Sequence, residues 1–275
     1  MDKRNAVILT GFAREYQFCF SDFLENLITS DNVDVFIATW NYVGVKAEYV
    51  SEQTITLTNN KPRDVKLKVS VDDSQIDIDD IREKYNPTDI KVFDEDLFIE
   101  SIEQYAKIVE SYELKLKSKA QHPGFCHHTL MRRYSIFYMS YQGWKLMERH
   151  AEANNITYEK VIKARFDWDR GGYYPKINWD KKIADKTIMI GGWNLQPYSN
   201  LDQRIPYDFQ DHFALGNYKD MFYYFNMFNN LFKLTDEFKH RTKKWHAEYC
   251  LSLWLHMNKI TCKVIKGSCS TACAP

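Results

Sequence analysis

The chain has 275 residues, a length that allows one or two domains with a sizeable hydrophobic core. Its residues are 44% hydrophobic and 27% charged, a globular composition that excludes disorder along the whole chain. The 37 basic and 37 acidic residues cancel, so no overall charge draws the protein to nucleic acid or to an anionic membrane.

The N-terminal part of the chain predicts a βαβ unit. Residues 6–10 form an apolar run that ends at Gly11, as in a strand buried on both faces of a parallel sheet. Apolar residues at helical spacing follow over 20–27, and residues 33–39 supply the next strand. This order favours a doubly wound sheet that starts parallel.

Residues 45–80 do not continue this pattern. Polar and apolar residues alternate over 54–58 and 65–69, on either side of Asn59-Asn-Lys-Pro62, which predicts a solvent-facing hairpin or insertion. Next along the chain we predict a short helix, a third core strand and a charged helix, over residues 81–85, 89–93 and 97–119.

The second half of the chain continues to alternate. The clearest helix is predicted over 127–155, where Gly143 weakens an otherwise regular apolar stripe slightly, and a strand from Tyr158 ends in acidic residues. Further strands are predicted over 187–190, 212–215 and 262–265, and further helices from Tyr218 and over 245–258. We therefore predict an α/β fold, a single domain over 1–266 with a Rossmann-like, mostly parallel central sheet flanked by helices, and a mobile tail over 267–275.

Cysteine usage and hydropathy predict a soluble cytoplasmic protein. The six cysteines are widely spread, form no Cys-x-x-Cys pair and lie in a chain long enough to fold without disulfides, so we expect reduced thiols. The N-terminal apolar run is too short for a secretory signal, and no segment approaches the roughly 18 apolar residues of a membrane helix. Any membrane association should be peripheral.

Polar residues follow the predicted strands at the points where ligands bind in open α/β sheets, beyond the carboxyl ends of the strands. Gly11 would let a phosphate or base approach the backbone, and Arg14 offers a planar fork for phosphate oxygens. Asp167 and Asp169 close another strand, where two carboxylates can hold one divalent cation that neutralises a diphosphate.

Several segments in order span most of the chain: Val7-Ile-Leu-Thr-Gly-Phe-Ala-Arg14, Asp34-Val-Phe-Ile-Ala-Thr-Trp40, Val161-Ile-Lys-Ala-Arg-Phe-Asp-Trp-Asp169, Asp211-His-Phe-Ala-Leu-Gly216 and His246-Ala-Glu-Tyr-Cys-Leu251. Together they resemble nucleotide-sugar-dependent glycosyltransferases of the GT-A fold. The likeness is to the small cytosolic kind from polysaccharide gene clusters and from large viruses that glycosylate their own capsids. The resemblance implies transfer of a sugar from a nucleoside-diphosphate donor, expected to be a UDP-sugar, to a hydroxyl of a glycan acceptor, in the host cytoplasm if the source is viral.

The resemblance also implies roles for individual residues. The nucleotide would be held by Thr10, Gly11, Arg14, Arg165 and Asp167, and a manganese or magnesium ion by Asp169 and Asp167. His246 is the further metal ligand that we predict, with His256 as the alternative; both fall within a helix whose pattern also suits ordinary packing. An inverting transferase would need a general base, for which Asp211, Asp208 and Glu248 are the candidates.

Two other functions fit the same sequence. One is a sugar-phosphate nucleotidyltransferase, although Thr10-Gly-Phe-Ala-Arg14 lacks the glycine-rich loop usual in that class. The other is a non-catalytic glycan-binding protein of the same fold. Donor turnover that depends on Asp169 would distinguish the transferase from the binding protein.

Overall fold

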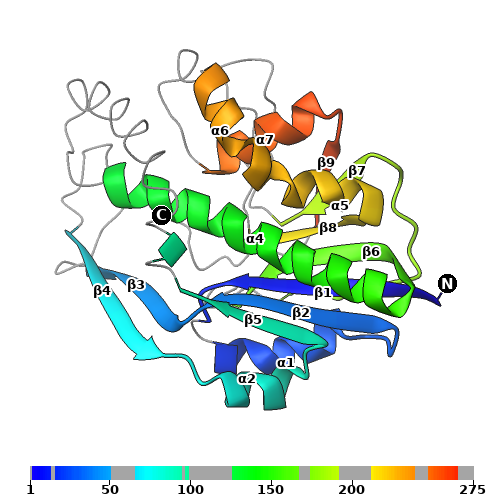
Figure 1. The fold of residues 1–275 in the computed structure, drawn as a ribbon, viewed down its shortest axis with the longest axis horizontal. Coiled ribbons are helices and arrows are strands. Elements are labelled where there is room, and N and C mark those ends of the chain that lie inside the picture. The colour runs from blue at the N-terminus through cyan, green and yellow to red at the C-terminus, as the bar shows by residue number, and fades with distance from the viewer. Residues whose placement is uncertain are drawn as a thin grey trace, which may run out of the picture.

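The central sheet has seven strands and is mostly parallel, with helices on both faces (Figure 1), which confirms the predicted fold class. The computed structural model describes residues 2–13, 16–50, 66–94, 97–98, 126–166, 174–191, 212–238 and 247–265. The strand order is β5-β2-β1-β6-β8-β7-β9. The strands are β1 Asp2–Gly11, β2 Val33–Trp40, β5 Asp89–Phe93, β6 Ile156–Arg165, β7 Thr187–Ile190, β8 Phe213–Asn217 and β9 Thr261–Val264.

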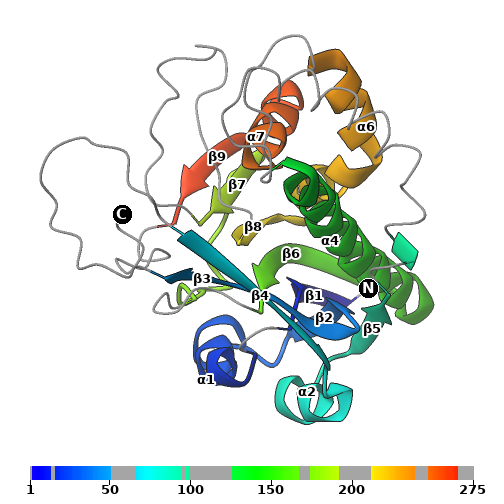
Figure 2. The ribbon, with the colours of Figure 1, turned by 90° about the vertical axis from the view of Figure 1, so that its left-hand side faces the viewer.

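The first four strands of that order are parallel, so their carboxyl ends meet at one edge of the sheet. β1 pairs with β2 on one side and with β6 on the other, and β2 pairs with β5. β8 runs antiparallel to both β6 and β7, and β9 is parallel to β7. Figure 2 looks onto the edge at which β1, β2, β5 and β6 end. Because β8 is antiparallel to β6, it begins at this same edge.

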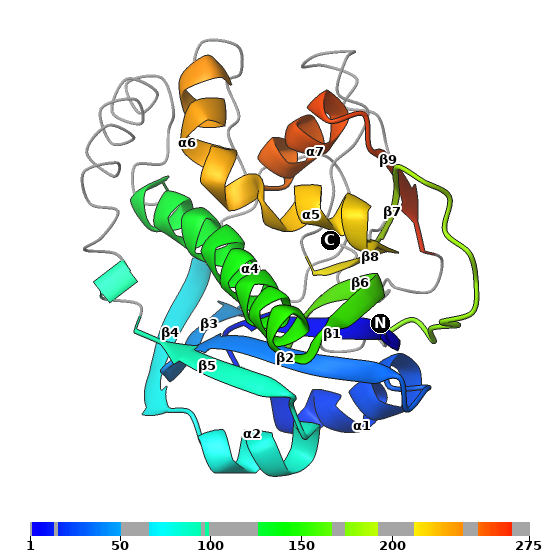
Figure 3. The ribbon, with the colours of Figure 1, turned by 45° about the vertical axis from the view of Figure 1, so that its right-hand side comes forward.

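Helices cover the two faces of the sheet unequally (Figure 3). Along β1, Val7 and Leu9 face one side while Ala6 and Ile8 face the other, and all four are fully buried. Coverage of both faces explains why the strand is continuously apolar. The helices on the Val7 side are α1 Tyr16–Leu27 and α2 Ile78–Tyr85; those on the Ile8 side are α4 Cys126–Asn154, α5 Tyr218–Phe225, α6 Met227–Phe238 and α7 Ala247–Met257.

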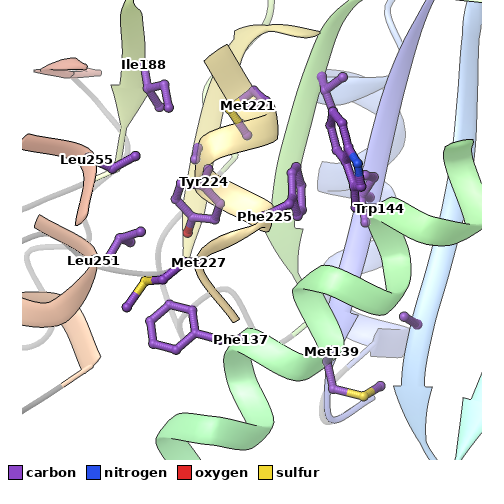
Figure 4. Packing of buried hydrophobic residues seen from close by; sticks show 14 of the residues in the cluster. Phe137, Met139, Trp144, Ile188, Met221, Tyr224, Phe225, Met227, Leu251 and Leu255 are labelled. Atoms are coloured by element: carbon purple, nitrogen blue, oxygen red, sulfur yellow. The ribbon is translucent and has the colours of Figure 1, made fainter. Parts of the chain in front are cut away.

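The larger core lies on the side of α4, where aromatic rings stack (Figure 4). The indole of Trp144 is stacked with Tyr218 and Phe225, with ring centroids 4.9 and 5.0 Å away. Beside it in the helix, Gly143 lies so close to β1 that a Cβ atom there would be 2.4 Å from Cγ2 of Ile8. The glycine that weakens the predicted helix is therefore what allows α4 to lie directly on the sheet.

Three predicted elements differ in the structure. Residues 89–93 form the strand at the edge of the sheet, and their burial is only partial, so β5 is not a core strand. The aromatic helix from Tyr218 is two helices, with Asn226 between them donating its backbone N–H to Phe222 O at 2.9 Å. An antiparallel ribbon is present near the predicted hairpin, and β4 Lys66–Gln75 overlaps the predicted strand over 65–69. Its partner is β3 Tyr42–Val50, a strand that the sequence did not predict.

Several predicted segments lie outside the described residues. They are the strand over 54–58, all of the helix over 97–119 except residues 97 and 98, and the tail over 267–275. Among the described helices, none is both long enough and apolar enough to span a bilayer.

A partly buried ion pair holds the amino edge of the sheet, opposite the ends of the parallel strands. Arg4 donates from Nε and Nη2 to the two carboxylate oxygens of Asp34, both at 2.7 Å. The hydroxyl of Tyr158 donates to the same carboxylate at 2.8 Å, and burial of that hydroxyl raises the pKa of Tyr158. These three residues join β1, β2 and β6 where they begin, remote from the predicted site.

Candidate functional site

The sheet has a topological switch point between β1 and β6. From β1 the chain proceeds to β2 and β5 on one side, and later returns to β6 on the other side of β1. Ligands of open α/β sheets bind at such a point, beyond the carboxyl ends of the strands. Thr10 is directly opposite Arg165 here, and Gly11 is opposite Thr39. Three predicted site residues, Thr10, Gly11 and Arg165, are thus brought together by strand pairing.

Gly11 supplies an approach to the backbone at the end of β1. Its φ is +101°, a conformation that residues with a Cβ rarely adopt, and a Cβ placed there would meet nothing within 4 Å. Thr10 is 2% exposed, and its methyl group faces α4 at Gly143. A ligand at this end of β1 could therefore reach the main chain of Gly11, whereas the side chain of Thr10 is covered.

Two basic residues lie on β6 near the same point. Because side chains alternate along a strand, Lys163 and Arg165 share the α4 side with Val161. Lys163 is fully buried, and Arg165 is partly exposed. The backbone N–H of Arg165 donates to His212 O at 3.2 Å, which places the residue before β8 beside the end of β6. Positive charge at the end of β6 favours an anionic ligand.

Aromatic rings line the carboxyl edge next to Gly11. Phe12 contacts Trp40 and Tyr42, with ring centroids 6.2 and 5.3 Å apart. Gly44, with a φ of +107°, lets β3 lie directly over Phe12, since a Cβ at Gly44 would be 2.5 Å from the ring. The rings continue toward β5 and α4 through Phe93, Phe98 and Tyr138. Phe12 and Tyr42 are only half-buried, so flat apolar surface is available beside the switch point.

Contacts between α1 and α2 fix the helix that follows β1. The hydroxyl of Tyr16 donates to Asp80 at 2.6 Å, and the hydroxyl of Tyr85 donates to the backbone carbonyl of Tyr16 at 2.6 Å. Burial, and then the Asp80 carboxylate, raises the pKa of Tyr16 to about 12, so this hydroxyl keeps its proton near neutral pH. The start of α1 is thereby fixed a few residues after Gly11, the last residue of β1.

The structure describes only some of the other predicted site residues. β6 ends at Arg165 and Phe166 begins a turn, while Asp167 and Asp169 lie outside the described residues, as do Arg14, Asp208, Asp211 and His246. Glu248 is the second residue of α7, and His256 is exposed in the last turn of that helix.

Sequence reasoning did not assign roles to Lys163, Phe12 or Tyr42. The only signal for Lys163 was a basic residue within an apolar strand, and nothing local predicted the contacts between the rings. Within the described ranges, no three His, Cys, Asp or Glu side chains are grouped as metal ligands. No protein-family model matches the chain, and no curated protein matches its sequence.

Proposed function

We propose that this protein is a metal-dependent glycosyltransferase that moves a sugar from a nucleoside diphosphate, with UDP as the expected carrier, to a hydroxyl of a glycan. The observation that carries the proposal is the switch point, where the open backbone at Gly11 lies beside Arg165 and half-buried aromatic rings. These three features suit a nucleoside diphosphate: the backbone and the positive charge can meet its phosphates, and the flat apolar surface can meet its base.

The donor would lie across the ends of β1 and β6. In this proposal the phosphates approach Gly11, Arg165 and Arg14, and the nucleoside lies against the rings of Phe12 and Tyr42. Arg165 is half-buried, so part of its side chain is accessible to an anion. Lys163 lies fully buried on the same side of the strand.

The carboxylates that follow β6 would hold the metal. Asp167 comes directly after Phe166, and Asp169 is two residues further along the chain. Carboxylate oxygens are the ligands that manganese and magnesium prefer, and His246 is a compatible nitrogen donor. When bound, the cation would neutralise the diphosphate and stabilise its departure from the sugar.

Asp211 is the proposed general base. β8 begins at the carboxyl edge, and the carbonyl of His212 accepts the N–H of Arg165, so Asp211 directly precedes a residue that contacts the site. It would take the proton of the acceptor hydroxyl as the oxygen bonds to the anomeric carbon and the nucleoside diphosphate leaves. Asp211→Asn should lower transfer by about a hundredfold or more while donor affinity stays nearly unchanged. If the rate does not change, Asp208 and Glu248 are the next candidates.

Nucleotide binding tests the proposal. UDP should raise the melting temperature in manganese or magnesium, and excess chelator should abolish this rise, because a ligand of the native state stabilises by mass action. Asp169→Ala should lose the rise, while Asp31→Ala, which removes an exposed carboxylate before β2, should keep it. Equal stabilisation with chelator present would contradict a metal-bridged diphosphate.

Donor turnover separates the transferase from a glycan-binding protein of the same fold. Release of UDP from UDP-sugars, with manganese present, should be measurable in the parent and lost in Asp169→Ala. Binding without turnover toward any acceptor would favour the binding protein. Cys262 is a free thiol, which suits the reducing compartment, the cytoplasm, in which we place this enzyme.

A further inference from the structure

A series of aromatic contacts leads from the switch point to the outer surface of α4. Phe12, directly after β1, contacts Trp40, the last residue of β2, and the Trp40 indole lies nearly parallel to the ring of Tyr138 with centroids 6.1 Å apart. The ring of Phe228 in α6 makes an edge contact with Tyr138 at 5.3 Å and lies nearly parallel to Tyr141 at 5.9 Å. Figure 3 shows α6 beside the first half of α4. The aromatic cluster of the candidate site therefore reaches these two helices.

The far end of this series is accessible to solvent. Tyr138, Tyr141 and Phe228 are half-buried, whereas Phe137 and Trp144, which α4 directs into the core, are 2% and 1% exposed. Part of each outer ring therefore faces water, although burial of apolar surface stabilises by about 25 cal/mol per Å². Flat apolar rings on a surface are suited to the C–H faces of sugars. We name the three half-buried rings the α4–α6 platform.

Polar groups lie beside the α4–α6 platform. Burial raises the pKa of Tyr138, so its hydroxyl keeps its proton near neutral pH, and within the described residues this hydroxyl makes no hydrogen bond. A tyrosine hydroxyl that is withdrawn from water usually has a partner, which a ligand would supply here. Gln142, a half-buried amide, follows Tyr141 in α4. The exposed amide of Asn229 follows Phe228 in α6. Sugar hydroxyls can bond to all of these groups.

The charges next to the platform compensate each other. The Nζ atom of Lys145 lies 5.7 Å from the centroid of the Tyr141 ring and 2.9 Å from a carboxylate oxygen of Glu148. This ion pair adds no net charge beside the rings, so a strongly anionic partner, such as nucleic acid or an anionic membrane, would gain little from it. Rings, neutral amides and a compensated ion pair together favour a neutral carbohydrate.

We propose that the α4–α6 platform is a subsite for the glycan acceptor, which binds sugars beyond the one that receives the transferred residue. This inference rests on the proposed function, because it gives an acceptor site to a transferase whose donor lies against Phe12. The buried indole of Trp40 contacts both Phe12 and Tyr138, which places the platform next to the proposed donor. Tyr141 and Phe228 would pack on the C–H faces of sugars, and the Tyr138 hydroxyl would donate to a sugar oxygen. None of the three rings takes part in the transfer step.

Three variants test the subsite. Tyr141→Ala removes one ring of the platform and retains α4, because alanine is favoured in helices. Tyr138→Phe removes one hydroxyl and keeps the ring against Trp40. The matched control, Phe18→Ala, removes a ring that is 83% exposed on α1, a helix on the opposite face of the sheet.

Two measurements separate the acceptor from the donor. The first is the affinity for labelled disaccharides and hexasaccharides of glucose, galactose, mannose and N-acetylglucosamine, with UDP and manganese present. The second is the affinity for UDP with manganese alone. We expect at least one hexasaccharide to bind the parent, and to bind more tightly than its disaccharide. Tyr141→Ala and Tyr138→Phe should weaken this binding by about threefold to tenfold, through loss of one ring contact or of one hydrogen bond, and should leave UDP affinity unchanged. Phe18→Ala should match the parent in both measurements.

The outcomes distinguish the subsite from the proposed function. If the parent binds UDP but no hexasaccharide, or if the two platform variants bind glycan as well as Phe18→Ala does, the subsite is wrong and the proposed function stands. If both variants weaken UDP binding as much as glycan binding, the residues are structural and the subsite is again wrong. If a hexasaccharide binds through Tyr141 while the parent neither binds UDP nor turns over UDP-sugars, the platform is a glycan site and the proposed function is wrong.

Discussion

Gly143→Ala should destabilise the protein, although this substitution normally stabilises a helix. In a helix interior, alanine is favoured over glycine by about 0.8–1.0 kcal/mol. Here the added Cβ would lie 2.4 Å from Cγ2 of Ile8 and 3.3 Å from Cγ2 of Thr10. Ile8 is fully buried in β1 and cannot move toward solvent.

The magnitude follows from these opposing effects. Overpacking in a core costs about 1–3 kcal/mol, and a 2.4 Å separation requires α4 or β1 to shift, which places the cost toward the upper end. After the helix preference is subtracted, we expect a net loss of about 1–2 kcal/mol in the free energy of unfolding. Urea denaturation should show a lower midpoint with an unchanged slope.

A second substitution tests the cause. Ile8→Ala removes the atom that the new Cβ would meet, so Gly143→Ala should cost less in that background, or should stabilise it. The two substitutions would then be non-additive, as expected for residues in direct contact. Stabilisation of the parent by Gly143→Ala, or the same cost in both backgrounds, would refute the close approach of α4 to β1.

Three further predictions concern other described residues. Asp34→Ala removes the carboxylate that accepts from Arg4 and from the Tyr158 hydroxyl, and should cost about 1.5–3 kcal/mol in urea denaturation; a cost below about 1 kcal/mol would mean that the pair is a weak surface contact. Gly11→Ala should cost about 1–3 kcal/mol from its φ alone, because the new Cβ meets no atom, and should also weaken UDP binding in a titration. Burial raises the pKa of the Asp22 carboxyl in α1, so its charge opposes folding as pH rises from the ordinary value of 3.8 through the raised value. Relative to the parent, Asp22→Asn should therefore gain stability across that window in denaturation series, and a difference that is flat with pH would contradict the buried carboxylate.

Sequence patterns predicted the sheet well where burial alone determines the residue type. The apolar run of β1 and the stripe of α4 are examples, since each must be apolar to fill a core. β5 was wrongly predicted to be a core strand, because five residues with mixed polarity do not show whether another strand lies beyond them. Residues 174–179 have no periodicity, and their place depends on hydrogen bonds to α1, which is distant in sequence.

The candidate site was only partly predictable for a similar reason. Gly11 was identified because a glycine directly after a buried strand commonly marks a turn or a close approach to the backbone, and its open backbone agrees with that interpretation. Arg165 was named next to Asp167, yet Tyr174, whose hydroxyl donates to the carbonyl of Arg165, follows nine residues later and gives no local signal. Such contacts join residues that are not neighbours in the sequence, so no local pattern predicts them.

The two outermost strands of the sheet also bear on how the protein behaves at high concentration. β5 and β9 have unpaired edges in the described structure, and such edges invite pairing with strands of other molecules. Each carries an exposed lysine near its centre, Lys91 in β5 and Lys263 in β9. A charged ammonium group at this position would have to be desolvated if a second chain added to the sheet. The two lysines therefore protect a strongly aromatic protein against aggregation by strand addition, and substituting both with valine should lower its solubility while leaving its fold intact.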